Sequence, residues 1–163
     1  MPRLGIKAKA YMLPAANTRA TWGAADTNGI HGGAAPTGLT ELTNIKDVTL
    51  NLTKGEADAT TRAANGWKVV LAALKEGSIE FEMNWDTTDT SFGQLFGSWL
   101  NDTTVAMAFL DGDEATSANQ GLWADFIVTG FAKKEPLAEV QTVSVTIKPA
   151  ASAVAPEWVK ITP

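Results

Sequence analysis

Apolar and polar residues alternate most clearly in two stretches of the chain, residues 47–53 and 78–85. In the first, Val48, Leu50 and Leu52 share one side, because successive side chains of a strand point to opposite faces. In the second, four large apolar residues alternate with a serine, two glutamates and an asparagine. A register shift of one residue would bury both carboxylates, so the register is strongly determined. Both stretches predict β-strands with one face on a core.

The pattern between these two strands is weaker. Lys54-Gly55 indicates a turn or a bulge, because glycine accepts positive φ angles. Small residues over 57–63 then predict a short returning strand, and Asn65-Gly66 is typical of a tight turn. Residues 67–74 are apolar except for one lysine, so periodicity does not separate strand from helix there, although a Val-Val pair favours strand.

Further strands are expected at residues 4–12, 105–110, 122–131 and 142–147. The first and last of these alternate at period two, which is the pattern of a strand with one buried face. Within 122–131, Trp123 stands between two apolar neighbours. This arrangement predicts that both faces of that strand are covered.

One helix is expected, over about residues 90–101. Its apolar residues recur at the i, i+3, i+4, i+7 and i+8 spacing of a single stripe. Asp89, Thr90 and Ser91 are candidate N-caps, and Ser91 with Gln94 matches a capping box. The elements together predict a mainly β fold, an antiparallel β-sandwich or half-barrel with one flanking α-helix.

Two segments lack this periodicity, residues 13–44 and residues 149–163. The first is rich in Ala, Gly, Asn, Thr and Pro, and long irregular segments inside a domain are usually functional or disordered. Because pure linkers rarely carry a tryptophan, Trp22 favours a long loop or arm that becomes ordered on a neighbouring subunit; a flexible insertion is the alternative. The second predicts a small-residue spacer and a C-terminal tail. We expect one domain over residues 1–163.

Composition narrows the classes of function. The chain has no cysteine, which excludes disulfides, thiolate metal sites and thiol catalysis. Its formal net charge is −5, with 18 acidic and 13 basic residues, which makes sequence-independent DNA binding a poor fit. The same sign suits a surface that DNA passes without adhering, or serves only solubility. No apolar run has membrane-spanning length and the N-terminus lacks the apolar core of an export signal, so no membrane partner is expected.

No constellation of residues predicts catalysis. His31 is the only histidine, so neither a catalytic triad nor a two-histidine metal site is indicated. Glu80 and Glu82 share a strand face, which is also what a solvated face gives. The acidic run 111–114 is shorter than a calcium loop and predicts an ordinary acidic turn. We therefore expect no enzyme activity and no cofactor.

Several separated stretches resemble, in order, the major tail tube proteins of long-tailed bacteriophages. They run from Asp47 to Trp67, Gly77 to Asp86, Gly121 to Phe126, Glu135 to Glu139 and Pro156 to Val159. The resemblance implies a β-sandwich or half-barrel subunit. Six such subunits form a ring, rings stack into a hollow tail tube, and strands of all six close a barrel around a lumen.

This resemblance also implies the partners and location of the protein. It implies that the chain associates with itself, with a tape-measure protein that fills the lumen, and with tail terminator and initiator proteins. DNA crosses the lumen without specific binding during ejection. The protein would be part of the virion tail and would assemble in the host cytoplasm.

The alternating strands supply candidates for the lumen or a solvent face, and alternation alone does not decide between these. The candidates are Thr49, Asn51, Thr53, Glu80, Glu82, Thr142, Ser144 and Thr146. A lumen of hydroxyls and scattered carboxylates, without a basic anchor, would let DNA slide. Candidates for contacts between rings or subunits are Trp22, Ile30, His31 and Trp158. On this view, removing residues 15–40 leaves a folded monomer that forms no tubes.

Two other functions remain open. The first is a monomeric β-sandwich module that binds carbohydrate, with exposed Trp123 or Trp67 as a stacking platform. The second is the tube protein of a contractile tail or secretion system, because these share the fold.

Overall fold

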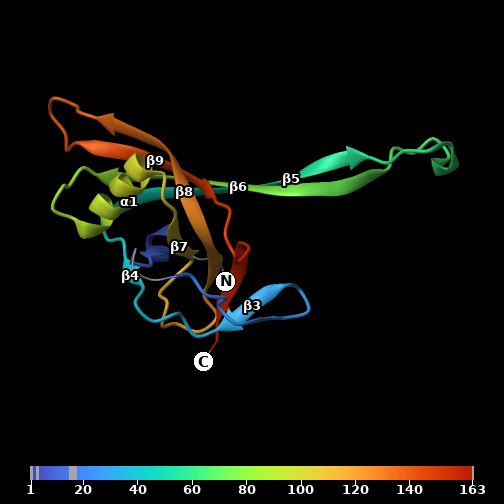
Figure 1. Cartoon of the computed structure of the whole chain (residues 1–163), viewed down its shortest axis with the longest axis horizontal. Coiled ribbons are helices and arrows are strands. Elements are labelled where there is room, and N and C mark those ends of the chain that lie inside the picture. Colours follow the sequence, from blue (N-terminus) through green and yellow to red (C-terminus); the bar gives the residue numbers. More distant parts are fainter. Residues whose placement is uncertain (1, 3, 15–17, 163) are drawn as a thin grey trace.

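The computed structural model describes residues 2, 4–14 and 18–162, and within them ten strands join into one sheet (Figure 1). The strands are β1 (Lys9–Met12), β2 (Ala24–Ala25), β3 (Ile30–Gly33), β4 (Thr40–Glu41), β5 (Ile45–Asp58), β6 (Val70–Asn84), β7 (Val105–Leu110), β8 (Gln120–Lys134), β9 (Thr142–Pro149) and β10 (Glu157–Ile161). One α-helix, α1 (Thr90–Asn101), and two 3₁₀ turns, η1 (Gly5–Lys7) and η2 (Arg62–Ala64), complete the described elements. No described helix is long and apolar enough to cross a membrane.

Strand β8 belongs to both halves of the sheet. Its first part pairs with β7 on one side and β10 on the other, and its second part pairs with β9. One wing of the sheet therefore runs β2-β3-β10-β8-β7-β1-β4, and the other runs β8-β9-β6-β5. All pairs are antiparallel except β3 with β10, which is parallel. The predicted mainly β fold with one flanking helix is confirmed.

The main core is formed by inward-facing residues of both wings and by α1. Ile79, Phe81 and Met83 of β6 are buried there, as their alternation with polar residues predicts. They meet the apolar residues of β9 and those of β7 and β8 that lie on the same side, while Phe92 and Leu95 of α1 add to this cluster. Burial of these large side chains supplies most of the driving force for folding.

A second core lies on the other face of β7 and β8. Trp123 is fully buried there and meets Trp22 edge-to-face, with ring centroids 5.5 Å apart. The prediction that both faces of this strand are covered is confirmed, and the cover comes from the irregular N-terminal segment. Leu13 and Leu39 of that segment pack in the same cluster.

The segment 13–44 is thus part of the folded domain wherever it is described. Its strand β3 pairs with β10, and Trp22 and Leu42 are buried. The burial of Trp22 in the second core argues against the expectation that residues 15–40 can be removed from a folded monomer. The C-terminal segment 149–163 is likewise more than a tail, since its strand β10 lies between β8 and β3. Residues 15–17 and 163 of the two segments lie outside the described residues.

Strands β5 and β6 form a long hairpin that extends beyond the rest of the molecule (Figure 1). Of the two alternatives predicted for Lys54-Gly55, the bulge agrees with the shift in register between Lys54 and Glu56, and the turn is wrong. The predicted returning strand at 57–63 is therefore wrong as well. The chain reverses instead between Asp58 and Val70. Asn65 and Gly66 both have positive φ there, 50° and 83°, which confirms the predicted turn at this pair.

Two local predictions change at the N-terminus and at α1. Residues 4–12 form a strand only from Lys9, because Gly5–Lys7 is a 3₁₀ turn with Leu4 and Ile6 exposed. Helix α1 has the predicted bounds, but Asp89 alone caps it, accepting a hydrogen bond from the Ser91 N–H. The capping box is wrong, since the Gln94 side chain donates instead to the Leu13 carbonyl.

Candidate functional site

The eight candidate lumen residues lie on one face of the β5-β6-β9 sheet. Thr49 of β5 is opposite Glu80 of β6, and Glu80 is opposite Thr146 of β9. Glu82 pairs in the same way with Ser144. Because alternate residues of a strand share a face, Asn51, Thr53 and Thr142 complete the set. Behind β6 and β9 the opposite face is the main core, so the polar face there points away from the protein interior, whereas Val48 and Leu52 on the opposite side of β5 are exposed.

These residues differ in exposure across the face. Residues of β5 and Glu80 are exposed, Glu82, Ser144 and Thr146 are half-buried, and Thr142 is 7% exposed. The accessible part of the face therefore lies toward the β5 edge and the middle of β6. Which surface of an assembly this face would line is not tested, and the lumen role of all eight residues stays a prediction.

The polar face carries lysines next to one of its carboxylates. Lys46 Nζ lies 3.6 Å from Glu82 Oε1, and Lys134 Nζ lies 3.9 Å from Glu82 Oε2. The expectation of a face without basic groups is therefore wrong around Glu82. Glu80, one cross-strand pair further along, has no ion pair among the described residues. The two glutamates have different electrostatic surroundings although they share a face.

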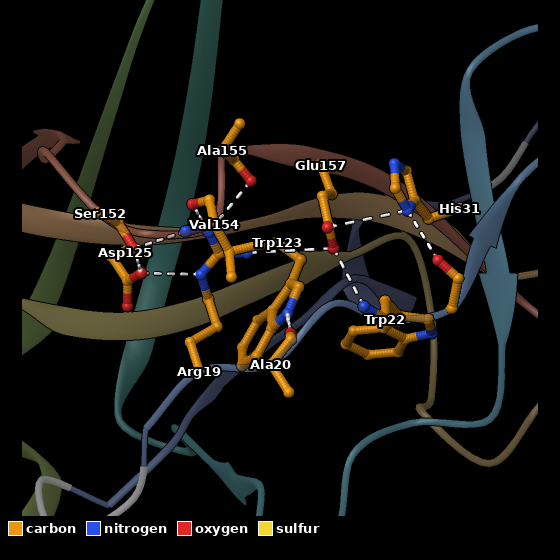
Figure 2. Close-up of polar contacts among 11 residues, drawn as sticks. Arg19, Ala20, Trp22, His31, Trp123, Asp125, Ser152, Val154, Ala155 and Glu157 are labelled. Carbon is orange, nitrogen blue, oxygen red and sulfur yellow. Dashed lines mark hydrogen bonds and ion pairs between the residues drawn. The ribbon is translucent and has the colours of Figure 1, made fainter.

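A buried charge network ties the N-terminal segment to β8 and β10 (Figure 2). The Arg19 side chain is 1% exposed, and its Nε donates to Asp125 Oδ2 over 2.9 Å. Its Nη2 donates to the carbonyls of Val154 and Ala155, and its Nη1 lies 3.9 Å from Glu157 Oε2. One buried cation thus joins three segments that are distant in the sequence.

Glu157 extends this network to the predicted contact residues. Its carboxylate accepts the Trp22 backbone N–H over 3.0 Å and lies 3.7 Å from His31 Nδ1 (Figure 2). His31 Nδ1 is also 2.9 Å from the Gly23 carbonyl, and since a carbonyl only accepts, Nδ1 carries a hydrogen. The histidine therefore serves here in positioning the segment.

The structure brings the four predicted contact residues together around β3 and β10. Ile30 pairs with Trp158, and His31 lies beside them. Trp158 is 36% exposed and its Nε1 donates to Gln120, whereas Trp22 is 3% exposed. Trp158 can reach a neighbour directly, but Trp22 could act only by holding the segment in place. Their roles at subunit contacts stay predictions.

The acidic turn at residues 111–114 is occupied by a lysine. Lys9 Nζ lies 2.9 Å from Glu41 and 3.0 Å from Asp113, and these bonds raise the pKa of Lys9. The Asp113 pKa is lowered, first by the Ala115 N–H and then by Lys9, whereas burial raises the pKa of Glu114. No group of three or more acidic or histidine residues in the described part of the chain could hold a metal ion.

Sequence reasoning missed the lysines beside Glu82 and the Arg19 network. Arg19 carried one usable signal, since it is a charged residue in a segment that has almost no others. Lys46 and Lys134 carried none, because their approach to Glu82 depends on how β5, β6, β9 and β8 are ordered. The length of the projecting hairpin was also missed, although Trp67 near its tip is exposed, at 79%, as the carbohydrate-binding alternative assumed.

No protein-family model and no curated protein matches this sequence. Three solved structures resemble the fold closely. The tail of an empty gene transfer agent particle, refined with C6 symmetry, has a TM-score of 0.66 at 10% identity, covering 93% of this chain and 96% of that chain. The SPP1 tail tube has a TM-score of 0.65 at 8% identity, covering 98% and 80%. A baseplate of the anti-feeding prophage has a TM-score of 0.58 at 9% identity, covering 98% and 97%.

These likenesses define the class of fold. The chain has the fold of phage tail tube proteins, as the resemblance in its sequence implies. The relation to the anti-feeding prophage means that the fold alone does not separate one kind of tail-like assembly from another.

Proposed function

We propose that this protein is a structural subunit of a virion tail tube. Six copies form a ring, rings stack into a hollow tube, and DNA passes through the lumen during ejection. The observation that carries the proposal is the two-faced sheet β8-β9-β6-β5, whose strands β6, β8 and β9 cover the main core on one side while the eight polar residues lie on the other. A tube wall made from a single sheet needs one face that packs on a core and one face that contacts the lumen.

The edge of this sheet supports assembly with further copies. Strand β5 is 14 residues long and, among the described strands, pairs only with β6, which leaves its other edge open to a further strand. Val48 and Leu52 on this strand are exposed. Long open edges with apolar residues favour aggregation unless another strand covers them. Closing a barrel between subunits would cover every such edge.

The surface charge supports passage of DNA rather than binding. Binding of the phosphate backbone needs clustered basic groups. The two lysines beside Glu82 are partly neutralised by its carboxylate. Glu80 has no ion pair among the described residues, although exposed Lys148 alternates onto the same face of β9 as Thr146, the partner of Glu80. The tape-measure, terminator and initiator proteins, and assembly in the host cytoplasm, are part of the proposal by analogy with tail tubes. The tube of a contractile tail remains the second candidate, favoured by the likeness to the anti-feeding prophage baseplate.

The alternative function, a carbohydrate-binding module, requires an exposed tryptophan, and one of its two candidates is excluded. Trp123 is fully buried and cannot stack on a sugar. Trp67 is exposed, but it lies near the tip of a projecting hairpin, away from the pockets of the domain. We therefore consider carbohydrate binding less well supported than the role of tube subunit.

Electron microscopy and sedimentation of the concentrated full chain test the proposed function. We expect hollow rings or tubes with six-fold symmetry, in which the polar face of β5, β6 and β9 points toward the lumen. A solid assembly, or a chain that sediments as a monomer at every accessible concentration, would contradict the proposal. If the side of the molecule that carries Trp158 formed the channel wall, the tube would be supported but the assignment of the polar face to the lumen would be wrong.

A further inference from the structure

Two exposed apolar surfaces lie at opposite ends of the molecule. The tip of the β5–β6 hairpin is at one end of its long axis, and α1 is at the other end (Figure 1). The two surfaces cannot meet within one chain, because the hairpin extends away from the domain. Each can therefore be covered only by another molecule.

The first surface, the hairpin tip, comprises residues 62–71. Trp67 is 79% exposed, and Val69 and Leu71 are 41% and 60% exposed. Arg62 and Lys68 lie among them, are exposed, and have no ion pair within the described part of the chain. The tip is thus apolar and cationic.

The second surface, the helix end, comprises Gly93, Gly97, Trp99, Leu100 and Asp102. Leu100 is 58% exposed. Trp99, on the neighbouring side of the helix, is 42% exposed, and its ring stacks on Phe96 and lies beside Phe131. The two glycines and Leu100 recur at i, i+4 and i+7, so they share a side of α1, and nothing lies within 4 Å of the position a Cβ would take at either glycine. Glycine weakens a helix, so two of them on an open side favour close approach by a partner chain.

The charge of the helix end is opposite to that of the tip. The C-terminal end of a helix carries partial negative charge, and Asp102 adds a carboxylate at this end. The last turn of α1 contains no basic residue, and Asp102 has no ion pair among the described residues. A carboxylate at a helix C-terminus is unfavourable alone and becomes favourable when a cation approaches.

We propose that the hairpin tip of one copy docks on the helix end of a second copy. Trp67 and Val69 would cover Trp99 and Leu100, while Arg62 and Lys68 would approach Asp102. The second copy is the indicated occupant because both complementary surfaces are present on this chain. A contact between two different patches is head-to-tail, so it generates a ring or a stack. The inference rests on the proposed self-assembly and names the surfaces that perform it.

Charge reversal of each surface, alone and together, tests the contact. R62E with K68E reverses the tip, and N101K with D102N reverses the helix end. Each pair alone places like charges together, and we expect an increase of at least about tenfold in the concentration needed for assembly. The chain that carries all four substitutions should regain assembly near the wild-type concentration, because its two surfaces are again complementary. Sedimentation velocity and electron microscopy report assembly, and circular dichroism reports folding.

Two further variants make the outcome decisive. Gly97→Gln enters open space in the monomer, so it should leave the chain folded and still reduce assembly. Because the chain has no cysteine, R62C mixed with N101C should form a disulfide between copies, whereas R62C mixed with N28C in the β2–β3 turn should not. Two results would overturn the docking without contradicting the proposed tube: assembly of the R62E/K68E chain at the wild-type concentration, or no better assembly of the chain with all four substitutions than of the chains with two. A wild-type chain that never assembles would overturn the proposed function itself.

Discussion

At the scale of single residues, Arg19 holds the N-terminal segment against the sheet. Its guanidinium meets Asp125, two backbone carbonyls and, at 3.9 Å, Glu157 (Figure 2). It also lies over the Trp123 ring, 5.7 Å from the centroid. Two largely buried carboxylates therefore depend on one cation. Removing such a cation leaves buried charge without compensation, which costs more than the pair itself contributes.

We expect Arg19→Ala to lower the free energy of unfolding by about 3–5 kcal/mol. Urea denaturation followed by tryptophan fluorescence measures this, and Trp22 and Trp123 report the same region. Arg62→Ala is the matched control, since Arg62 is exposed on the hairpin and its loss should change stability by less than about 0.5 kcal/mol. Equal stability of the two variants would contradict the role of the network.

The predicted polar residues show what residue patterns can and cannot establish. Alternation, which is local to each strand, separates Thr49, Glu80 and Thr146 from their apolar neighbours, but their common face follows from the pairing of β5, β6 and β9. Their chemical surroundings do not follow from alternation either, as the contrast between Glu80 and Glu82 shows. Trp22 illustrates the same limit, because a tryptophan in an irregular segment fits a surface anchor and a core residue equally well.

At the scale of elements, α1 is determined largely by its own residues. Its apolar stripe buries Phe92 and Leu95, and Asp89 caps its first turn. Both signals act within one or two turns of chain, which explains why the predicted bounds agree with the structure. The capping box was wrong because Gln94 has a competing acceptor, the Leu13 carbonyl, that is distant in the sequence.

Asp89→Ala should reduce stability by about 1 kcal/mol, because the Ser91 N–H at the helix start loses its acceptor. Thermal unfolding followed by circular dichroism measures the loss. Asp89→Ser keeps a side-chain acceptor of similar capping strength and should retain most of the stability. If the serine variant were as unstable as the alanine variant, the effect would not come from capping.

Unlike α1, the β5–β6 hairpin is not determined by its own residues alone. Its outer half has exposed apolar residues on a segment with no core beneath it, including Leu71 and Leu74. The turn considered at Lys54-Gly55 rested on the glycine alone, and the apolar run 67–74 has no periodicity that separates strand from helix, so the length of the hairpin did not follow from the sequence. The length of the hairpin makes sense only when another molecule covers it, as the proposed docking on α1 would do.

At the scale of the whole molecule, the polar face would become the wall of a channel. Ring closure would place one copy of Glu80 from each of six subunits around the lumen, with Glu82 held beside Lys46 and Lys134. The residue that controls repulsion of phosphate is then Glu80 rather than Glu82. Six identical substitutions per ring would amplify any change of charge at this position.

Tubes of Glu80→Lys should retain short duplex DNA that wild-type tubes release, with retention falling steeply as salt rises. Co-sedimentation of labelled duplex with assembled tubes over a salt series measures this, and ejection from intact tails should slow in parallel. Tubes of Glu80→Gln should retain an amount of DNA between those of wild-type and Glu80→Lys tubes. Asn28→Lys, which adds a cation in the β2–β3 turn, is the positional control and should retain no more than wild type. Equal retention by Glu80→Lys and Asn28→Lys tubes would remove Glu80 from the channel wall.

The sequence by itself determined the two-faced strand at residues 78–85, the helix at residues 90–101 and which polar residues share a face within each strand. These follow from periodicity, which depends on a residue and its near neighbours in the chain. The core face predicted for residues 47–53 is wrong at Val48 and Leu52, which are exposed. Only the tertiary structure decided that β8 serves two wings, that the segment around Trp22 covers Trp123, and that two lysines meet Glu82. These features depend on which distant strands become neighbours, and alternation within a strand carries no information about its partner.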